Sequence, residues 1–312
     1  MKRFIVKIGL YFIITLSIII TIACGIFMAI SKNHYTFSYG SNSISYNMKA
    51  GFIDWNLKKF NNAKIIVIGS SMDLNNIDAL MIEQNFNLST FNVASWSMKL
   101  RDFTKFHLWD NNNIVICNIQ FPDFGNSEIE IKNRYTFEIN KFSEIFNIIL
   151  DHKTYMEQIK EVPFLSSGKA SNTYEYCKFD ECGSVLFNDS NFKKNFKRWN
   201  MDYFKTQKIE SEMMNDWVAD LKGIIDSHKR RNKIIITFSP SRGKIYSQEK
   251  SELVQKLGLL IKEKCTNVYF IDKYDLNYSD NLFVDSYHFN KNGADKFTRE
   301  IMTVIKEQKL IN

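Results

Sequence analysis

Five short apolar runs constrain the fold of this chain more than any other feature of its sequence. Each run has six to eight residues and is rich in β-branched or aromatic side chains: 64–69 (KIIVIG), 89–94 (STFNVA), 113–120 (NIVICNIQ), 233–238 (KIIITF) and 267–272 (NVYFID). Such runs are typical of strands buried on both faces of a parallel sheet. Amphipathic segments that suit helices lie at 74–86, 98–109, 248–264 and 291–306. The alternation predicts an α/β fold, a doubly wound parallel sheet with helices on both faces.

The interval from about 124 to 228 is too long for a single crossover between two strands. Helical patterns at 139–159 and 203–228 flank an irregular stretch, 163–200. Long insertions in compact domains are often functional, so we expect a helical insertion that forms a lid or a partner surface.

Composition narrows the classes of protein to which this chain can belong. The apolar fraction of 45% and the aromatic fraction of 14% favour a packed core over disorder. Three prolines and twelve glycines exclude collagen-like and low-complexity architectures. The net charge is +7, with basic clusters at 193–198 and 229–231 that could face anionic envelope polymers or lipid headgroups, or simply be solvated. Because no nucleic-acid-binding motif surrounds these clusters, we expect no nucleic-acid partner.

The N-terminal segment predicts a membrane anchor. Residues 8–30 form an uncharged run of 23 residues that follows three basic residues. As a helix this run would be about 34 Å long, enough to span the hydrocarbon core of a bilayer. The flanking positive charges predict a cytoplasmic N-terminus and an extracytoplasmic domain. A cleaved signal peptide or a lipoprotein signal at Cys24 fits less well, because the apolar run continues past Cys24 without a clear small-x-small exit site.

We therefore predict three parts. They are a cytoplasmic tip and single transmembrane signal anchor at 1–31, a polar and aromatic stalk at 32–62, and an α/β domain at 63–312. Cys177 and Cys182 are separated by four residues in the insertion. In an oxidising compartment they could form a disulfide, and two free thiols are the alternative.

Candidate catalytic side chains follow the first and the fifth predicted strands, and open α/β sheets place their sites beyond the carboxyl ends of strands. Gly69 permits a tight turn after the first run, and Ser71 then begins a helical segment. Asp285 precedes His288 by three residues, so a carboxylate can hold one imidazole nitrogen while the other faces a hydroxyl. Taken singly, the serine also fits a helix N-cap and the Asp–His pair a surface turn. Their placement at one sheet edge favours a site.

The residues around these positions resemble the SGNH/GDSL hydrolase superfamily. IIVIGSSMDLNNID looks like its first sequence block, with GSS where the family name has GDS, and FVDSYHFNKNGADKFTREI looks like its last block. The resemblance covers 64–306, interrupted by the insertion. It implies a flavodoxin-like arrangement of the five strands, with Ser71 as nucleophile, His288 as base and Asp285 as the acid that orients it. We expect neither a metal nor a cofactor.

The middle blocks of this chain depart from the superfamily pattern. Block two normally supplies a glycine N–H to the oxyanion hole, but FNVASWSMKL has no glycine, and Ser97 is the nearest positional equivalent. Block three normally supplies an Asn side chain after the third strand. Here Asn118 and Gln120 share one strand face, and Gln120, nearer the strand end, is the preferred third donor. Strand-end hydrogen bonding without catalysis is the alternative for both amides.

An anchored domain of this kind resembles cell-envelope acylation proteins, which work beside a multispanning membrane acyltransferase. The resemblance implies O-acylation, with acetyl or D-alanyl groups, of an envelope polysaccharide or teichoic-acid-like polymer at the outer face of the membrane, through an acyl-Ser71 intermediate. An esterase or deacetylase of the same fold is the first alternative, and a catalytically decayed envelope-binding scaffold is the second. Arg242 could bind an anionic group and Trp96 could line an acyl or sugar pocket, although a loop arginine and a packing tryptophan are the simpler interpretations.

Overall fold

Five strands form one all-parallel sheet at the centre of the protein. The computed structural model describes residues 2–34, 44–96, 98–105, 114–124, 179–187, 211–227 and 233–311. The strand order is β2-β1-β3-β4-β5, in which β1 is Ile65–Ile68, β2 Thr90–Asn92, β3 Ile114–Ile119, β4 Lys233–Phe238 and β5 Val268–Asp272. This confirms the predicted parallel sheet. The order matches the flavodoxin-like arrangement, in which β2 lies on one side of β1 and the later strands follow on the other side.

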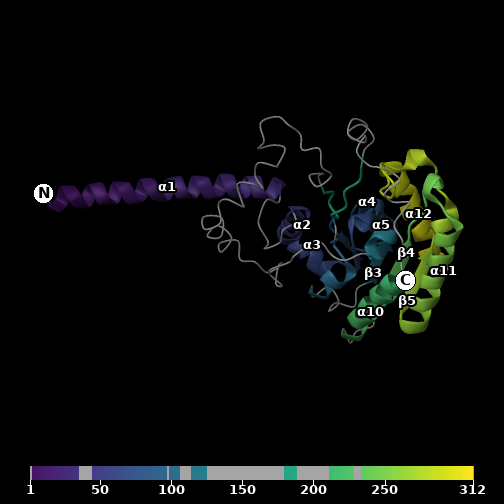
Figure 1. Cartoon of the computed structure of the whole chain (residues 1–312). Helices are drawn as coiled ribbons and strands as arrows, with labels where there is room; N and C mark the ends of the chain where they lie inside the picture. The colour runs from purple at the N-terminus through teal and green to yellow at the C-terminus, as the bar shows by residue number, and fades with distance from the viewer. Residues whose placement is uncertain are drawn as a thin grey trace.

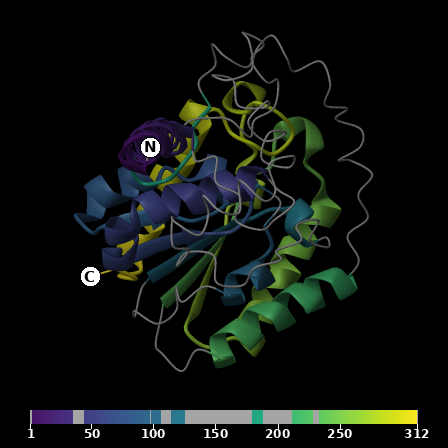
Figure 2. The ribbon, with the colours of Figure 1, turned by 90° about the vertical axis from the view of Figure 1, so that its left-hand side faces the viewer.

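Helices cover both faces of the sheet (Figure 2). One face packs against α2 (Ile44–Trp55), α10 (Ser211–Ser227) and α11 (Gln248–Lys264). The other face packs against α5 (Ala79–Phe86) and α12 (Lys291–Glu307). Successive strand residues alternate between these two cores: Ile66 and Ile68 point into the first, while Ile65 and Val67 point into the second. β1 is therefore apolar on both faces, as its uninterrupted apolar run predicts.

The N-terminal helix α1 (Lys2–His34) extends away from the sheet domain (Figure 1). Its described apolar side chains are exposed, Ile13 and Ile18 among them. Among the described helices, none satisfies the length and hydropathy expected of a membrane span.

The region predicted as a stalk differs in the structure. Most of it, from residue 44 to residue 62, forms α2 and α3 (Leu57–Asn62). Tyr46, Phe52 and Ile53 of α2 are almost fully buried in the core on one face of the sheet. These apolar residues therefore belong to the folded domain, because burying them on the sheet removes a large apolar area from water.

The prediction of one continuous helix at 74–86 is wrong. The chain forms α4 (Ser71–Asn76) and then α5, with extended backbone at Ile77 between them. Asp78 caps α5 by accepting a hydrogen bond from Met81 N, and the Asp78 N–H donates to Thr298 Oγ1. A local cap and a tertiary hydrogen bond thus outweigh helix continuation. The helix predicted at 98–109 is likewise not an α-helix where it is described, since Leu100–Lys105 is a short 3₁₀ helix.

Residues 179–187 are the described part of the irregular stretch predicted at 163–200, and they pack against the sheet domain. Val185 N–H donates to Leu74 O and Lys291 N–H donates to Phe187 O, which ties the segment to α4 and to the start of α12. The fully buried Lys49 donates to Asn92 O and to Gly183 O, which links the segment to α2 and β2. The helix predicted at 139–159 lies outside the described residues, and α10 accounts for the described part of that predicted at 203–228.

Candidate active site

The turn after β1 places Ser71 at the carboxyl edge of the sheet. Gly69 has φ +136°, and a Cβ at this position would lie 1.8 Å from Asp73 Oδ2, so only glycine fits the turn. Ser70 caps α4 by accepting a hydrogen bond from Met72 N at 3.1 Å. Ser71 is then the first residue of α4 and remains partly exposed. The N-cap role that the sequence left open for Ser71 therefore belongs to its neighbour Ser70, which leaves the Ser71 hydroxyl for another partner.

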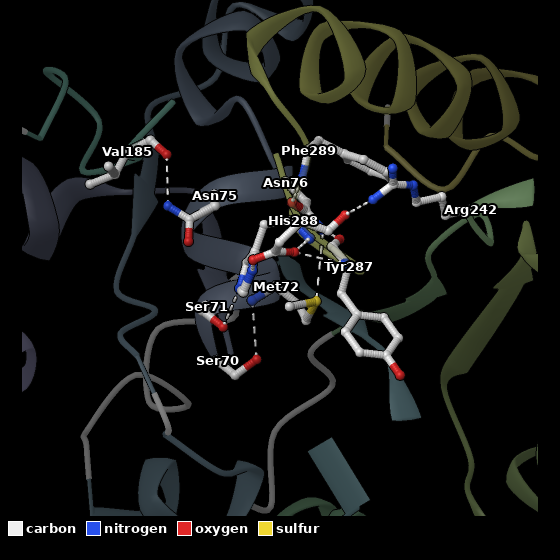
Figure 3. Close-up of polar contacts among 11 residues, drawn as sticks. Ser70, Ser71, Met72, Asn75, Asn76, Val185, Arg242, Tyr287, His288 and Phe289 are labelled. Atoms are coloured by element: carbon white, nitrogen blue, oxygen red, sulfur yellow. Dashed lines mark hydrogen bonds and ion pairs between the residues drawn. The ribbon is translucent and has the colours of Figure 1, made fainter. Parts of the chain in front are cut away.

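The hydroxyl of Ser71 faces His288 (Figure 3). Ser71 Oγ lies 2.8 Å from His288 Nε2, and His288 Nδ1 lies 2.6 Å from Asp285 Oδ2. The other carboxylate oxygen of Asp285 accepts the backbone N–H groups of Tyr287 and His288, each at 2.8 Å. An ionised carboxylate only accepts, so Nδ1 carries the proton and Nε2 accepts from the serine hydroxyl. The structure thus brings together the three residues that sequence analysis singled out at opposite ends of the domain.

The carboxyl group of Asp285 is ionised despite its burial. Burial by itself would raise its pKa, but the charge of His288 and the hydrogen bonds from His288 and Tyr287 outweigh burial and lower the pKa below its ordinary value. Asp285 can therefore hold the imidazole in one tautomer and stabilise the imidazolium ion that forms when His288 takes a proton.

A side chain that was not assigned to the site from sequence holds the loop that carries His288. Asn76 of α4 is fully buried, donates to Tyr287 O at 3.0 Å and accepts from Phe289 N at 2.8 Å. Its amide thus ties the helix that begins with Ser71 to the backbone on both sides of His288 (Figure 3). Asn76 is the second asparagine of IIVIGSSMDLNNID, but only its contact in space with the last block reveals this role.

Arg242 holds the same loop from the other side. Its Nη1 donates to Asp285 O at 2.9 Å, and its Nε donates to Asp280 Oδ1 at 2.8 Å. The guanidinium also lies 5.9 Å from the centre of the Phe283 ring. These contacts give Arg242 a structural role in the loop of Asp285, where the sequence had suggested either an anion-binding residue or an ordinary loop arginine.

The two amides predicted as oxyanion donors are engaged in hydrogen bonds with the protein. Gln120 Nε2 donates to Ser239 O at 3.1 Å, and its Oε1 accepts from Phe121 N at 3.1 Å. Asn118 Nδ2 donates to Met72 O at 3.1 Å, and its Oδ1 accepts from the hydroxyls of Thr237 and Ser239. Both side chains are almost fully buried, which fits the alternative of strand-end hydrogen bonding. Ser97 lies outside the described residues.

Two further carboxyl groups are buried under the nucleophile turn. Asp73 Oδ1 accepts from Asn118 N, whereas Oδ2 has no hydrogen-bond partner among the described residues. Burial, together with the nearby Asp123, raises the pKa of Asp73 well above its ordinary value, which favours the protonated form of this carboxyl group. Burial also raises the pKa of Asp123, although Lys99 and the hydroxyl of Ser70 counteract the rise. Sequence analysis missed both groups, because burial of an acidic residue has no local sequence signature.

Two remaining expectations concern metals and cysteines. No group of three or more His, Cys, Asp or Glu side chains in the described ranges could hold a metal ion. Cys182 is a buried free thiol 3.1 Å from Lys59 Nζ, and Cys177, with which it could pair, lies outside the described residues, so the choice between a disulfide and two free thiols stays open. The chain matches no protein-family model, and no curated protein matches it significantly.

Proposed function

We propose that this chain is a serine-dependent acyl-transfer enzyme of the SGNH/GDSL-like type, with Ser71 as nucleophile, His288 as general base and Asp285 as its orienting partner. One observation carries the proposal: the hydroxyl, the imidazole and the carboxylate form a continuous hydrogen-bonded chain, with 2.8 Å between Ser71 Oγ and His288 Nε2 and 2.6 Å between His288 Nδ1 and Asp285 Oδ2. These distances are those of a nucleophile that a neighbouring base can deprotonate.

In the first step, Ser71 Oγ attacks the carbonyl carbon of an acyl donor while its proton passes to His288 Nε2. The donor's leaving group then takes that proton, and the acyl group stays on Ser71 as an ester. In the second step, an acceptor hydroxyl gives its proton to His288 and attacks the ester, which returns the proton to Ser71 Oγ. Because Ser71 opens α4, its backbone N–H is outside the helical hydrogen-bond ladder and can serve the oxyanion of both tetrahedral intermediates.

The acceptor in this proposal is a hydroxyl of a cell-envelope polysaccharide or teichoic-acid-like polymer, and the acyl group is acetyl or D-alanyl. Support comes from the uncharged run at 8–30, from the exposed apolar side chains of α1, and from a net charge of +7 that suits an anionic polymer. An N-terminal anchor with the domain on the outer face would place Ser71 beside a multispanning acyltransferase that supplies the acyl group. Cell fractionation, followed by protease treatment of intact cells, tests this location.

Hydrolysis by an esterase or deacetylase of the same fold differs only in the acceptor, which would be water. A chromogenic acetyl ester offered to the full-length protein and to Ser71→Ala tests the shared first step. The wild-type protein should release the chromophore and Ser71→Ala should not, whereas equal rates would refute the nucleophile and favour a decayed binding scaffold. Adding oligosaccharide acceptors and following acetylated product by mass separates transfer from hydrolysis.

A further inference from the structure

The indole of Trp96 lies against the imidazole of His288. The two ring centres are 5.1 Å apart and the ring planes are inclined by 31°. Trp96 follows β2, so it reaches His288 from the same carboxyl edge of the sheet as Ser71, and it also packs against the core that contains α2. This spacing is within the range of offset stacking between aromatic rings.

The placement of Trp96 matters because both nitrogens of His288 are engaged at the rim of the ring. Nδ1 contacts Asp285 and Nε2 contacts Ser71, so both polar atoms of the imidazole are engaged and its faces and C–H edges remain for other contacts. The inclined indole of Trp96 lies toward one face, and Phe187 approaches the imidazole at 87°, with 6.4 Å between ring centres. The imidazole therefore has a carboxylate at one nitrogen, a hydroxyl at the other and two aromatic side chains against the ring.

We propose that Trp96 is a positioning residue of the acyl-transfer site, which stabilises the imidazolium form of His288 through the indole face and fixes the plane of its ring. This inference rests on the proposed function. A tryptophan face attracts a cation more strongly than it attracts a neutral ring. His288 becomes an imidazolium ion in each step when it accepts a hydroxyl proton, so the contact is stronger at that point than in the resting site. An interaction that strengthens in this way lowers the barrier.

Two carboxyl groups also act on His288. Asp285 contacts the ring on its own loop, and Asp123, in the 3₁₀ helix Phe121–Phe124 after β3, interacts with His288 electrostatically. Lys99 accompanies Asp123 and donates to Pro122 O at 2.7 Å. A substitution of Trp96 that preserves packing therefore changes the aromatic contribution while these charges stay in place.

The test compares Trp96→Leu, which keeps an apolar side chain but has no aromatic face, with Trp96→Phe, which keeps a face. Each full-length variant is labelled with a fluorophosphonate between pH 5 and 9. In this reaction Ser71 Oγ bonds to phosphorus, fluoride leaves and the hydroxyl proton passes to His288. We expect Trp96→Leu to label about 3- to 10-fold more slowly than wild type on the plateau, and Trp96→Phe to recover most of that loss. Thermal unfolding of each variant serves as the folding control.

The pH profile separates stabilisation of the imidazolium from a packing role. Trp96→Leu removes stabilisation of the protonated ring, so the low-pH side of the profile of labelling rate against pH should move to lower pH by about half a unit. In Trp96→Phe it should lie close to its wild-type position. Equal rates and equal low-pH sides of the profile in folded Trp96→Leu and Trp96→Phe would refute the role of Trp96 and leave the proposed function intact. If the wild-type protein labels no faster than Ser71→Ala, the proposed function itself fails.

Discussion

Asn76→Ala should uncouple the catalytic loop from the helix that begins with Ser71. The substitution removes one hydrogen bond to Tyr287 O and one from Phe289 N, and both of these residues are almost fully buried. Leaving a buried backbone group without its partner costs about 1–3 kcal/mol. We therefore expect Asn76→Ala to lower the free energy of unfolding by about 2–5 kcal/mol, measured by urea denaturation.

The effect on Ser71 should exceed what the loss of stability explains. His288 lies between the two backbone groups that Asn76 holds, so its ring loses restraint on both sides. A displacement on the order of 1 Å in a catalytic group can reduce a rate about 10²-fold, and we expect fluorophosphonate labelling of folded Asn76→Ala to be about 10- to 100-fold slower. The assay is run at low urea, where each variant is fully folded.

Asn75→Ala is the matched control. Asn75 is the neighbouring amide on α4, is equally buried, and donates to Val185 O at 2.9 Å in the 179–187 segment. Among the described residues, Asn75 has no hydrogen bond to the loop of His288, so its loss should lower stability by about 1–2 kcal/mol with little change in the labelling rate. If Asn75→Ala and Asn76→Ala slow labelling equally, or if Asn76→Ala labels at the wild-type rate, the reasoning about the loop is refuted.

Two further predictions concern buried carboxyl groups. Because the pKa of Asp73 is raised in the folded protein, the unfolded chain loses the carboxyl proton at a lower pH than the folded protein does, so Asp73 lowers stability above the ordinary carboxyl pKa. Asp73→Asn should remove this cost and raise the urea midpoint above that of wild type by more at pH 7 than at pH 4. A midpoint of the variant below that of wild type at pH 7 would contradict the raised pKa of Asp73. The pKa of Asp285 is lowered, so its contribution to stability is present above the ordinary carboxyl pKa and is lost as pH falls through the folded value. Asp285→Asn should not show this loss of stability at low pH, and fluorophosphonate should label it about 10³- to 10⁴-fold more slowly than wild type. A labelling rate near that of wild type would exclude Asp285 as the orienting group.

Sequence alone predicts the sheet and the ends of several helices because their signals are local. The β-branched runs coincide with all five strands, and α11 has its predicted bounds because Ser247 caps its first turn. The break at Ile77 could not be predicted with the same ease, since it depends on hydrogen bonds with residues that lie more than 100 positions away: Ser184 donates to Ile77 O, and Thr298 accepts from Asp78 N. The burial of α2 likewise depends on the sheet surface that receives it.

In the candidate site, too, local sequence signals predict some residues, whereas others are revealed only by contacts between distant parts of the chain. Ser71, Asp285 and His288 can be proposed from sequence, because parallel strands bring their carboxyl ends to one edge and short motifs occur there. Asn76, Arg242 and the aromatic contact of Trp96 depend on distances between elements, which a single sequence does not encode visibly. For the oxyanion donors, face periodicity placed Asn118 and Gln120 on one side of β3 but could not show that both amides bind backbone carbonyls.

The attachment of residues 179–187 has a consequence for how the chain assembles. This segment hydrogen-bonds to α4 and to Lys291 at the start of α12, more than 100 positions away along the chain. Contacts between such distant residues form slowly, because closing a long loop costs entropy before the contact contributes. The aromatic ring of Phe187 can reach His288 only after the insertion has docked, so the complete site forms late in folding. A shortened version of this protein must therefore keep 179–187, even where it omits the residues on either side.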